Sequence, residues 1–186
     1  MNIGVLALQG DFREHIDILQ DHGVGAKAIR SLKELNESFD GLILPGGEST
    51  VIGRLLKASH MLEVLRERIN EGLPVFGTCA GLILLAKELE GGEKPHIGTM
   101  DIIARRNAYG RQLGSFTQNG SFGSSTVPMV FIRAPYITAV GPDVEVLSVV
   151  AGKIVAAREK NMLVTAFHPE LTRDFTAHRL FLDMIS

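Results

Sequence analysis

Short aliphatic runs alternate with amphipathic stretches through the first half of the chain. The aliphatic runs have the length and composition of buried strands, and they cover residues 2–8, 24–29, 41–44 and 74–77. The stretches between them repeat apolar residues at helical spacing and predict helices from Asp11 to Gly23 and over residues 31–35, 49–57, 60–70 and 81–88. Such alternation is typical of an α/β fold with an open, doubly wound and mostly parallel sheet that carries helices on both faces.

Asp11 and Glu14 mark the start of the first helix. A carboxylate at the N-cap and a Glu three residues later can satisfy two backbone amides that have no partner within the helix, so this pair predicts a capping box. Apolar residues then recur at helical spacing, and Gly23 is expected to end the helix.

The second half of the chain has a different pattern. Residues 100–167 are strand-like, so we expect antiparallel strands added to the sheet. These residues are interrupted by turn residues at Gly120, Gly123, Pro142 and Gly152. The segment 114–125 is rich in Gly, Ser, Thr and Asn, which predicts a mobile loop and not a linker between domains. A last helix over 175–185 would complete a single domain spanning residues 1–186.

The composition excludes several classes of protein. The 186 residues include 19 Lys and Arg and 21 Asp and Glu, a formal charge of −2, and this balance offers no basic surface for nucleic acid or an anionic membrane. The longest mostly apolar stretch, residues 73–86, is shorter than the roughly 20 residues that span a bilayer. No basic segment precedes the first apolar run, so we expect a cytoplasmic protein without a secretory signal.

The single cysteine, Cys79, excludes an internal disulfide and a zinc site made of several thiolates. It stands in Gly77-Thr78-Cys79-Ala80-Gly81, where a predicted strand meets a helix. Glycines two positions before and after a residue permit a sharp turn that presents its side chain at the sheet edge. There, the dipole and free amides of the helix favour a thiolate and can hold an oxyanion. A buried structural cysteine is the alternative.

His168 and Glu170 can supply the base that a thiol nucleophile needs. Residues i and i+2 of an extended segment face the same way, and Pro169 restricts the backbone between them, so Glu170 can orient the imidazole toward Cys79. A lone histidine is more often a packing or surface residue. The other histidines have no comparable partner, and we expect them to be solvated or incidental: His15, His22, His60, His96 and His178.

A glycine-rich loop, Leu-Pro-Gly-Gly-Glu-Ser-Thr at residues 44–50, follows the third predicted strand. Gly46 and Gly47 leave backbone amides able to face a substrate oxygen, and Ser49 can cap the next helix. The alternative is a glycine turn without a functional role.

Together these segments resemble the class I glutamine amidotransferase family, which carries a Cys and His-x-Glu triad on an open α/β fold. Further motifs are similar to the glutaminase subunits of pyridoxal 5'-phosphate synthases within that family, and they cover nearly the whole chain: LQGDFREH at 8–15, LPGGEST at 44–50, GTCAGLILLAKE at 77–88, RNAYGRQ at 106–112, FIRAP at 131–135 and FHPELT at 167–172. The chain departs from the pattern at Asp11-Phe12, where small apolar residues are common, and at Tyr109, where Phe is frequent.

The resemblance implies an enzyme that hydrolyses L-glutamine to L-glutamate and ammonia through a thioester. The ammonia would pass to the synthase subunit of a pyridoxal 5'-phosphate synthase. Cys79 would be the nucleophile, His168 the acid and base and Glu170 the orienting carboxylate, with no cofactor and no metal. The implied oxyanion hole is formed by the amides of Gly47 and Ala80; the implied glutamine-binding residues are Gly47, Glu48, Ser49, Arg106, Ile132 and Arg133, and those facing the synthase are Gln9 and Gly10.

Two other classes of protein remain open on the residues alone. A hydrolase or chaperone-like enzyme of a related open-sheet fold would share the cysteine turn, but it would not need His-x-Glu after the final strand. A non-catalytic regulatory subunit would be expected to have lost a member of the triad, whereas Cys79, His168 and Glu170 are all present.

Overall fold

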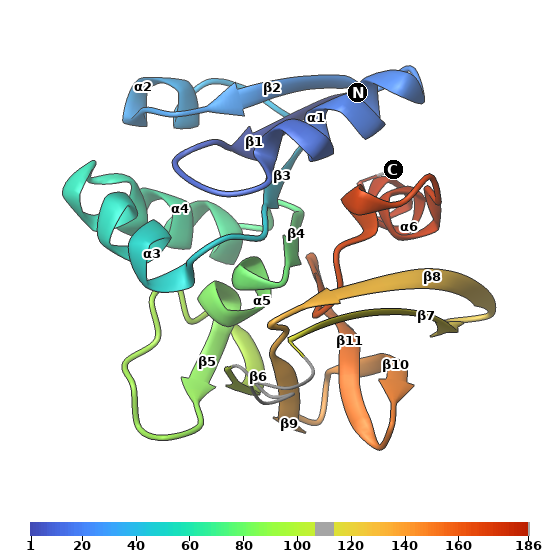
Figure 1. Cartoon of the computed structure of the whole chain (residues 1–186). Helices are drawn as coiled ribbons and strands as arrows, with labels where there is room; N and C mark the ends of the chain where they lie inside the picture. The colour runs from blue at the N-terminus through green and yellow to red at the C-terminus, as the bar shows by residue number, and fades with distance from the viewer. Residues whose placement is uncertain (107–113, 186) are drawn as a thin grey trace.

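The computed structural model describes residues 1–106 and 114–185 (Figure 1). Tyr109 and most of the motif at 106–112 lie outside the described residues. Within the described ranges, no helix has both the length and the apolar character needed to cross a membrane.

A twisted sheet, ten-stranded over the described residues, forms the centre of the molecule. One half is parallel and runs in the order β2 (Gly25–Ile29), β1 (Asn2–Leu6), β3 (Gly41–Leu44), β4 (Val75–Thr78) and β12 (Met162–Thr165). The sheet continues, mainly through antiparallel pairs, with β11 (Lys153–Glu159), β9 (Tyr136–Val140), β6 (Met100–Arg105) and β5 (Ala86–Leu89), while β10 (Glu145–Val150) pairs with β11. The predicted parallel sheet with antiparallel additions is confirmed.

Helices cover both faces of this sheet, as predicted. They are α1 (Phe12–Asp21), α2 (Leu32–Leu35), α3 (Ser49–Ala58), α4 (Met61–Asn70), α5 (Ala80–Leu85) and α6 (Thr176–Asp183), with a 3-10 turn η2 (Pro169–Leu171) before α6. In Figure 1, α3 and α4 lie on one side of β4 and α6 lies on the other. Phe76 of β4 packs against Phe181 of α6, with ring centroids 5.7 Å apart, which joins α6 to the buried core.

The helix predicted over residues 81–88 is shorter in the structure. It ends at Leu85, and from Ala86 the chain forms β5, which pairs in parallel with β6. A continuous apolar run does not distinguish a buried helix from a buried strand, so the boundary depends on the neighbouring strand. The other predicted elements differ from the observed ones only at their ends.

The prediction of a mobile loop over residues 114–125 is wrong. Ser115–Phe122 forms strand β7, which pairs along its whole length with β8 (Ser125–Ile132) in a separate two-stranded sheet. Its polar residues face solvent, but Phe116 stacks on Phe131 with ring centroids 4.7 Å apart, and Phe122 is buried. The few aromatic side chains therefore tie a mostly polar strand to the core.

The predicted capping box of α1 is also absent. Asp11 stands at the N-cap, but its side chain makes no capping hydrogen bond. The Asp11 carboxylate lies instead 3.5 Å from Nδ1 of His168. Gly23 follows the helix with φ of +73°, as expected for its end.

Candidate active site

Cys79 occupies a strained turn between β4 and α5. Its φ of 47° is unusual for a residue with a side chain, and its amide donates a 2.8 Å hydrogen bond to the carbonyl of Thr165 in β12. A Cβ on Gly77 would lie 2.7 Å from the backbone of Gly81, and one on Gly81 would lie 2.3 Å from the carbonyl oxygen of Leu44. Close backbone approach thus requires the two flanking glycines, as the sequence pattern predicts.

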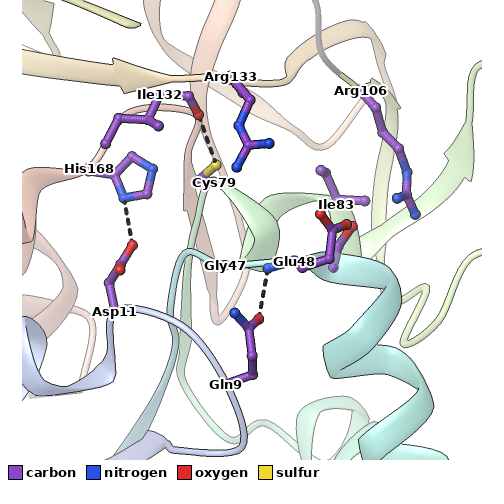
Figure 2. Close-up of a pocket in the computed structure, with 11 residues that line it drawn as sticks. Gln9, Asp11, Gly47, Glu48, Cys79, Ile83, Arg106, Ile132, Arg133 and His168 are labelled. Atoms are coloured by element: carbon purple, nitrogen blue, oxygen red, sulfur yellow. Dashed lines mark hydrogen bonds and ion pairs between the residues drawn. The ribbon is translucent and has the colours of Figure 1, made fainter. Parts of the chain in front are cut away.

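The Cys79 side chain opens into a cavity of about 340 Å³ at the carboxyl edge of the parallel strands (Figure 2). Ten of the residues that line this cavity were named from the sequence as candidate site or capping residues, and only Ile83 was not. The lining residues are Gln9, Asp11, Gly47, Glu48, Ser49, Cys79, Ile83, Arg106, Ile132, Arg133 and His168. In Figure 2, Cys79 lies between the His168 ring and the Arg133 side chain, and its sulfur is 4.0 Å from the carbonyl oxygen of Ile132.

His168 and Glu170 form a buried pair beside the cysteine. Nδ1 of His168 lies 2.7 Å from Oε1 of Glu170, and the two side chains are 4% and 0% exposed. The amide of His168 donates to the carbonyl of Val130 in β8, at 2.8 Å. The two side chains meet as predicted, but the predicted extended backbone is wrong, because Pro169 begins the 3-10 turn η2. Proline suits this position, since its fixed φ fits a helical first residue.

The surroundings of His168 favour its charged form. Burial lowers the pKa of the imidazole, but the Cys79 and Glu170 side chains outweigh this effect and raise the pKa to about 10. Burial also raises the pKa of the Glu170 carboxyl, although the neighbouring His168 opposes that shift. At neutral pH, the imidazolium form of His168 is therefore favoured.

The loops after β1 and β3 hold each other. The amide of Asp11 donates a 3.0 Å hydrogen bond to the carbonyl of Gly46, and the amide of Glu48 donates a 2.8 Å bond to Oε1 of Gln9. Gly47 has φ of +152°, a conformation that is accessible to glycine and strained for other residues. A Cβ on Gly46 would lie 2.4 Å from Cε1 of His168, so the glycine loop lies directly against the imidazole.

Two helix starts face the same cavity. Ala80 is the first residue of α5, where backbone amides have no acceptor within the helix. Ser49 is the first residue of α3 and is buried, while Glu48 occupies the N-cap, so the prediction that Ser49 caps the helix is wrong. Arg106 donates from Nη1 to Oγ1 of Thr50, at 2.9 Å, and thereby contacts the first turn of α3.

Two features of the site were missed by sequence reasoning. Asp11 reaches His168 although it was expected to cap a helix. His15 and His178, expected to be solvated or incidental, are fully buried and interact with each other. The motif LQGDFREH contains both Asp11 and His15, but His168, which Asp11 contacts, and His178, which His15 contacts, lie more than a hundred residues away in the sequence.

Donor atoms of Asp11, His168 and Glu170 lie within 4.8 Å of one another, which makes them the group to consider as metal ligands within the described part of the chain. Nδ1 of His168 is already engaged with Glu170. The group is therefore better suited to orienting an imidazole than to binding a metal ion.

A cysteine presented in this way beside a buried histidine and glutamate, at the edge of an open parallel sheet, is the arrangement expected of glutamine amidotransferases. A solved structure described as "Crystal structure of glutamine amidotransferase" superposes with a TM-score of 0.94 at 45% identity, covering 100% of this chain and 99% of the other. Residues 5–186 match the SNO glutamine amidotransferase family, and the chain belongs to that family.

Curated relatives of similar length agree with this assignment. A protein of Haemophilus influenzae (strain PittGG), named "Pyridoxal 5'-phosphate synthase subunit PdxT", is 54% identical and the alignment covers 99% of this chain and 98% of the relative. A protein of the same name from Streptococcus pneumoniae (strain CGSP14) is 55% identical, with 99% and 97% covered.

Proposed function

We propose that this protein is the glutaminase subunit of a pyridoxal 5'-phosphate synthase. It hydrolyses L-glutamine to L-glutamate and ammonia and delivers the ammonia to a synthase subunit. The observation that carries this proposal is Cys79, held at a strained turn in the same cavity as His168, whose Nδ1 pairs with the buried Glu170. Membership of the glutamine amidotransferase family and the names of the relatives support the substrate and the partner.

The first half of the reaction forms a thioester. The Cys79 thiolate attacks the side-chain amide carbon of glutamine, and the carbonyl π electrons move to the oxygen. The amides of Gly47 and Ala80 stabilise this oxyanion. The tetrahedral intermediate collapses as the C–N bond breaks, and the His168 imidazolium donates the proton with which the nitrogen leaves as ammonia.

The second half releases glutamate. Neutral His168 removes a proton from a water molecule, whose oxygen attacks the thioester carbon and forms a second tetrahedral intermediate. The C–S bond breaks, which restores the Cys79 thiolate beside protonated His168, and the product carboxylic acid gives its proton to water as glutamate leaves. Glu170 keeps its hydrogen bond to Nδ1 of His168 throughout, which directs Nε2 at the reacting atoms.

The cavity offers charged partners for the α-carboxylate and α-ammonium groups of free glutamine. Its volume of about 340 Å³ lies in the range of small-ligand sites. The guanidinium of Arg133 can pair with the α-carboxylate, and the Glu48 carboxylate can pair with the α-ammonium. Ile132, Ser49 and Arg106 complete the lining around the substrate.

Gln9 and Gly10 are proposed to face the synthase subunit, because they belong to the loop that touches the glycine loop beside the site. We further propose that residues 1–186 act as one domain. A cytoplasmic location is consistent with a nucleophilic thiol, which a reducing compartment keeps from oxidising.

The proposal is tested with glutamine labelled with ¹⁵N at the side-chain amide. The protein is mixed with a cognate synthase subunit and its sugar-phosphate substrates, and glutamate and labelled pyridoxal 5'-phosphate are measured. We expect both products, and the label in the cofactor should be lost when Cys79 is replaced by alanine. Glutamate without label transfer would contradict the synthase role, and no glutamate would contradict glutaminase activity.

A further inference from the structure

A buried polar chain continues from Glu170 into the interior, behind the proposed triad of Cys79, His168 and Glu170. Oε1 of Glu170 faces His168, whereas Oε2 is buried without a hydrogen-bond partner among the described residues and lies 3.4 Å from Nε2 of His15. The same nitrogen of His15 lies 3.1 Å from Oγ1 of Thr78. Nδ1 of His15 lies 3.0 Å from Nε2 of His178.

The members of this buried polar chain come from four separate segments of the polypeptide. His15 belongs to α1, Thr78 to β4, Glu170 to η2 and His178 to α6. The side chain of Glu170 has no exposed surface, and His15, Thr78 and His178 are also 0% exposed. Because unpaired polar groups are costly in such an interior, their mutual arrangement constrains how Glu170 lies.

The charge states of His15 and His178 determine which of their ring nitrogens donate hydrogen bonds and which accept them. Burial lowers the pKa of His15 well below its usual value and that of His178 to about 3, so both rings are neutral at neutral pH. A neutral imidazole has one donor and one acceptor nitrogen. If Nε2 of His15 were the acceptor, its lone pair would face the carboxylate of Glu170. The favourable tautomer donates from Nε2 of His15 toward Oε2 of Glu170 and accepts at Nδ1 from Nε2–H of His178.

We propose that His15 is a positioning residue of the glutaminase reaction. Its Nε2–H lies between Oγ1 of Thr78 and the inner oxygen of Glu170 and attracts that oxygen electrostatically, so that the outer oxygen is directed at Nδ1 of His168. His178 selects the tautomer of His15 that can do this. This role rests on the proposed function and extends the proposed triad inward by two residues. Neither histidine contacts the cavity in which the substrate would bind.

The buried polar chain also affects the ionisation of Glu170. Glu170 is faced by His168, His15 and Asp11; His15 is faced by His178 and His168, and the charged or titratable groups near His178 are His22 and Asp174. Loss of the His15 ring would remove the imidazole nitrogen that lies 3.4 Å from this buried anionic oxygen. We therefore expect the pKa of Glu170 to rise and the acid limb of activity to move to higher pH.

Two substitutions of His15 separate donation from packing. The amide nitrogen of His15→Gln can take the place of Nε2, whereas that of His15→Asn is near the place of Nδ1 and cannot reach Glu170. In complex with the synthase subunit, His15→Asn should lower kcat for glutamine hydrolysis by about tenfold or more, with KM nearly unchanged. His15→Gln should recover most of kcat and the parent pH profile.

A matched control is Leu19→Ala, which removes a buried side chain one turn further along α1. It should lower the melting temperature without moving the acid limb. Equal kcat values and equal acid limbs for the Asn and Gln variants would overturn the inference, because His15 would then act only through packing.

Alkylation of Cys79 by iodoacetamide tests the positioning role of His15 without glutamine. The chain has one cysteine, so mass spectrometry follows a single thiol as pH is varied. His15→Asn should shift the pH dependence of alkylation, and His15→Gln should not. If the parent complex releases no glutamate, the proposed function fails but this shift still tests His15. An unshifted His15→Asn profile would refute the positioning role even if the parent is an active glutaminase.

Discussion

The side-chain oxygen of Gln9 accepts a 2.8 Å hydrogen bond from the backbone amide of Glu48, and this hydrogen bond joins the loop after β1 to the glycine loop after β3. A Cβ on Gly47 would lie 2.6 Å from the same Gln9 oxygen, so the Gln9 side chain packs directly against the glycine loop. We therefore expect that a partner contacting Gln9 changes the direction of the Gly47 amide, which is proposed to hold the oxyanion.

Dependence on the partner is the first prediction. The isolated chain should bind glutamine weakly and hydrolyse it slowly, because the glycine conformation at Gly47 does not by itself fix the oxyanion hole. An equimolar cognate synthase subunit should raise kcat/KM roughly tenfold or more by selecting the productive loop. Steady-state glutamate release with and without the partner measures this. Identical rates would show that the hole is permanently formed.

Replacement of the nucleophile is the second prediction. Cys79→Ala should abolish glutamine hydrolysis, because no other thiol is present in the chain. The free energy of unfolding should change by only about 1 kcal/mol, since the methyl group fills part of the same space. A glutamine-like electrophile should label the parent at Cys79 and leave the alanine variant unlabelled. Hydrolysis by the variant at the parent rate would exclude Cys79 as the nucleophile.

His168 and Glu170 should differ in their contributions. His168→Asn should be nearly inactive, because the proton transfers of both half-reactions depend on this ring. Glu170→Gln should retain more activity, because the amide still occupies the space beside Nδ1 while orienting the imidazole less well. The kcat values of both variants in the complex test this order. Small and equal losses would contradict the triad.

Arg133 should act in binding and not in the chemical step. Arg133→Ala should raise KM for glutamine about tenfold or more, with a smaller change in kcat, because a charge-assisted pair with the α-carboxylate is lost. Arg105→Ala is a suitable control, since Arg105 pairs with Glu90 away from the cavity. An unchanged KM for Arg133→Ala would remove this residue from the binding site.

Acid should destabilise the fold through His178. Burial lowers its pKa from 6.5 to about 3 in the folded state, so below about pH 6.5 the unfolded chain binds a proton that the folded chain does not. The free energy of unfolding should therefore fall as pH decreases from about 6.5 toward 3, by about 2 kcal/mol at pH 4.5 from this group.

Urea unfolding at pH 4.5 and 7.5 measures this effect. His178→Leu should depend less on pH over this range, although it is less stable at neutral pH because the contact with His15 is lost. The exposed His60 provides the control, and His60→Asn should keep the parent pH dependence. Parallel curves for the parent and His178→Leu would contradict the prediction.

The local pattern of residues was sufficient for most of the fold. Aliphatic runs separated by amphipathic stretches predicted β1 to β4 and the helices between them, because burial on both faces of a parallel sheet selects such runs. The glycines around Cys79 predicted the sharp turn for a local reason, namely the space available to the backbone. The local pattern was not sufficient where pairing with a neighbouring strand decides the structure. A mostly polar segment became β7 because β8 lies beside it, and an apolar helix ended at Leu85 because β6 pairs with Ala86.

The segments that carry reactive side chains can be found in the sequence, since the cysteine turn, the glycine loop and the His-x-Glu motif are each visible within a few residues. What those side chains face depends on the packing of the whole fold. Asp11 was free to cap its own helix but lies beside His168, and His15 meets His178, 163 positions further along the chain. Such contacts depend on how strands and helices from both ends of the chain pack together, and packing of that kind has no period or spacing in the sequence.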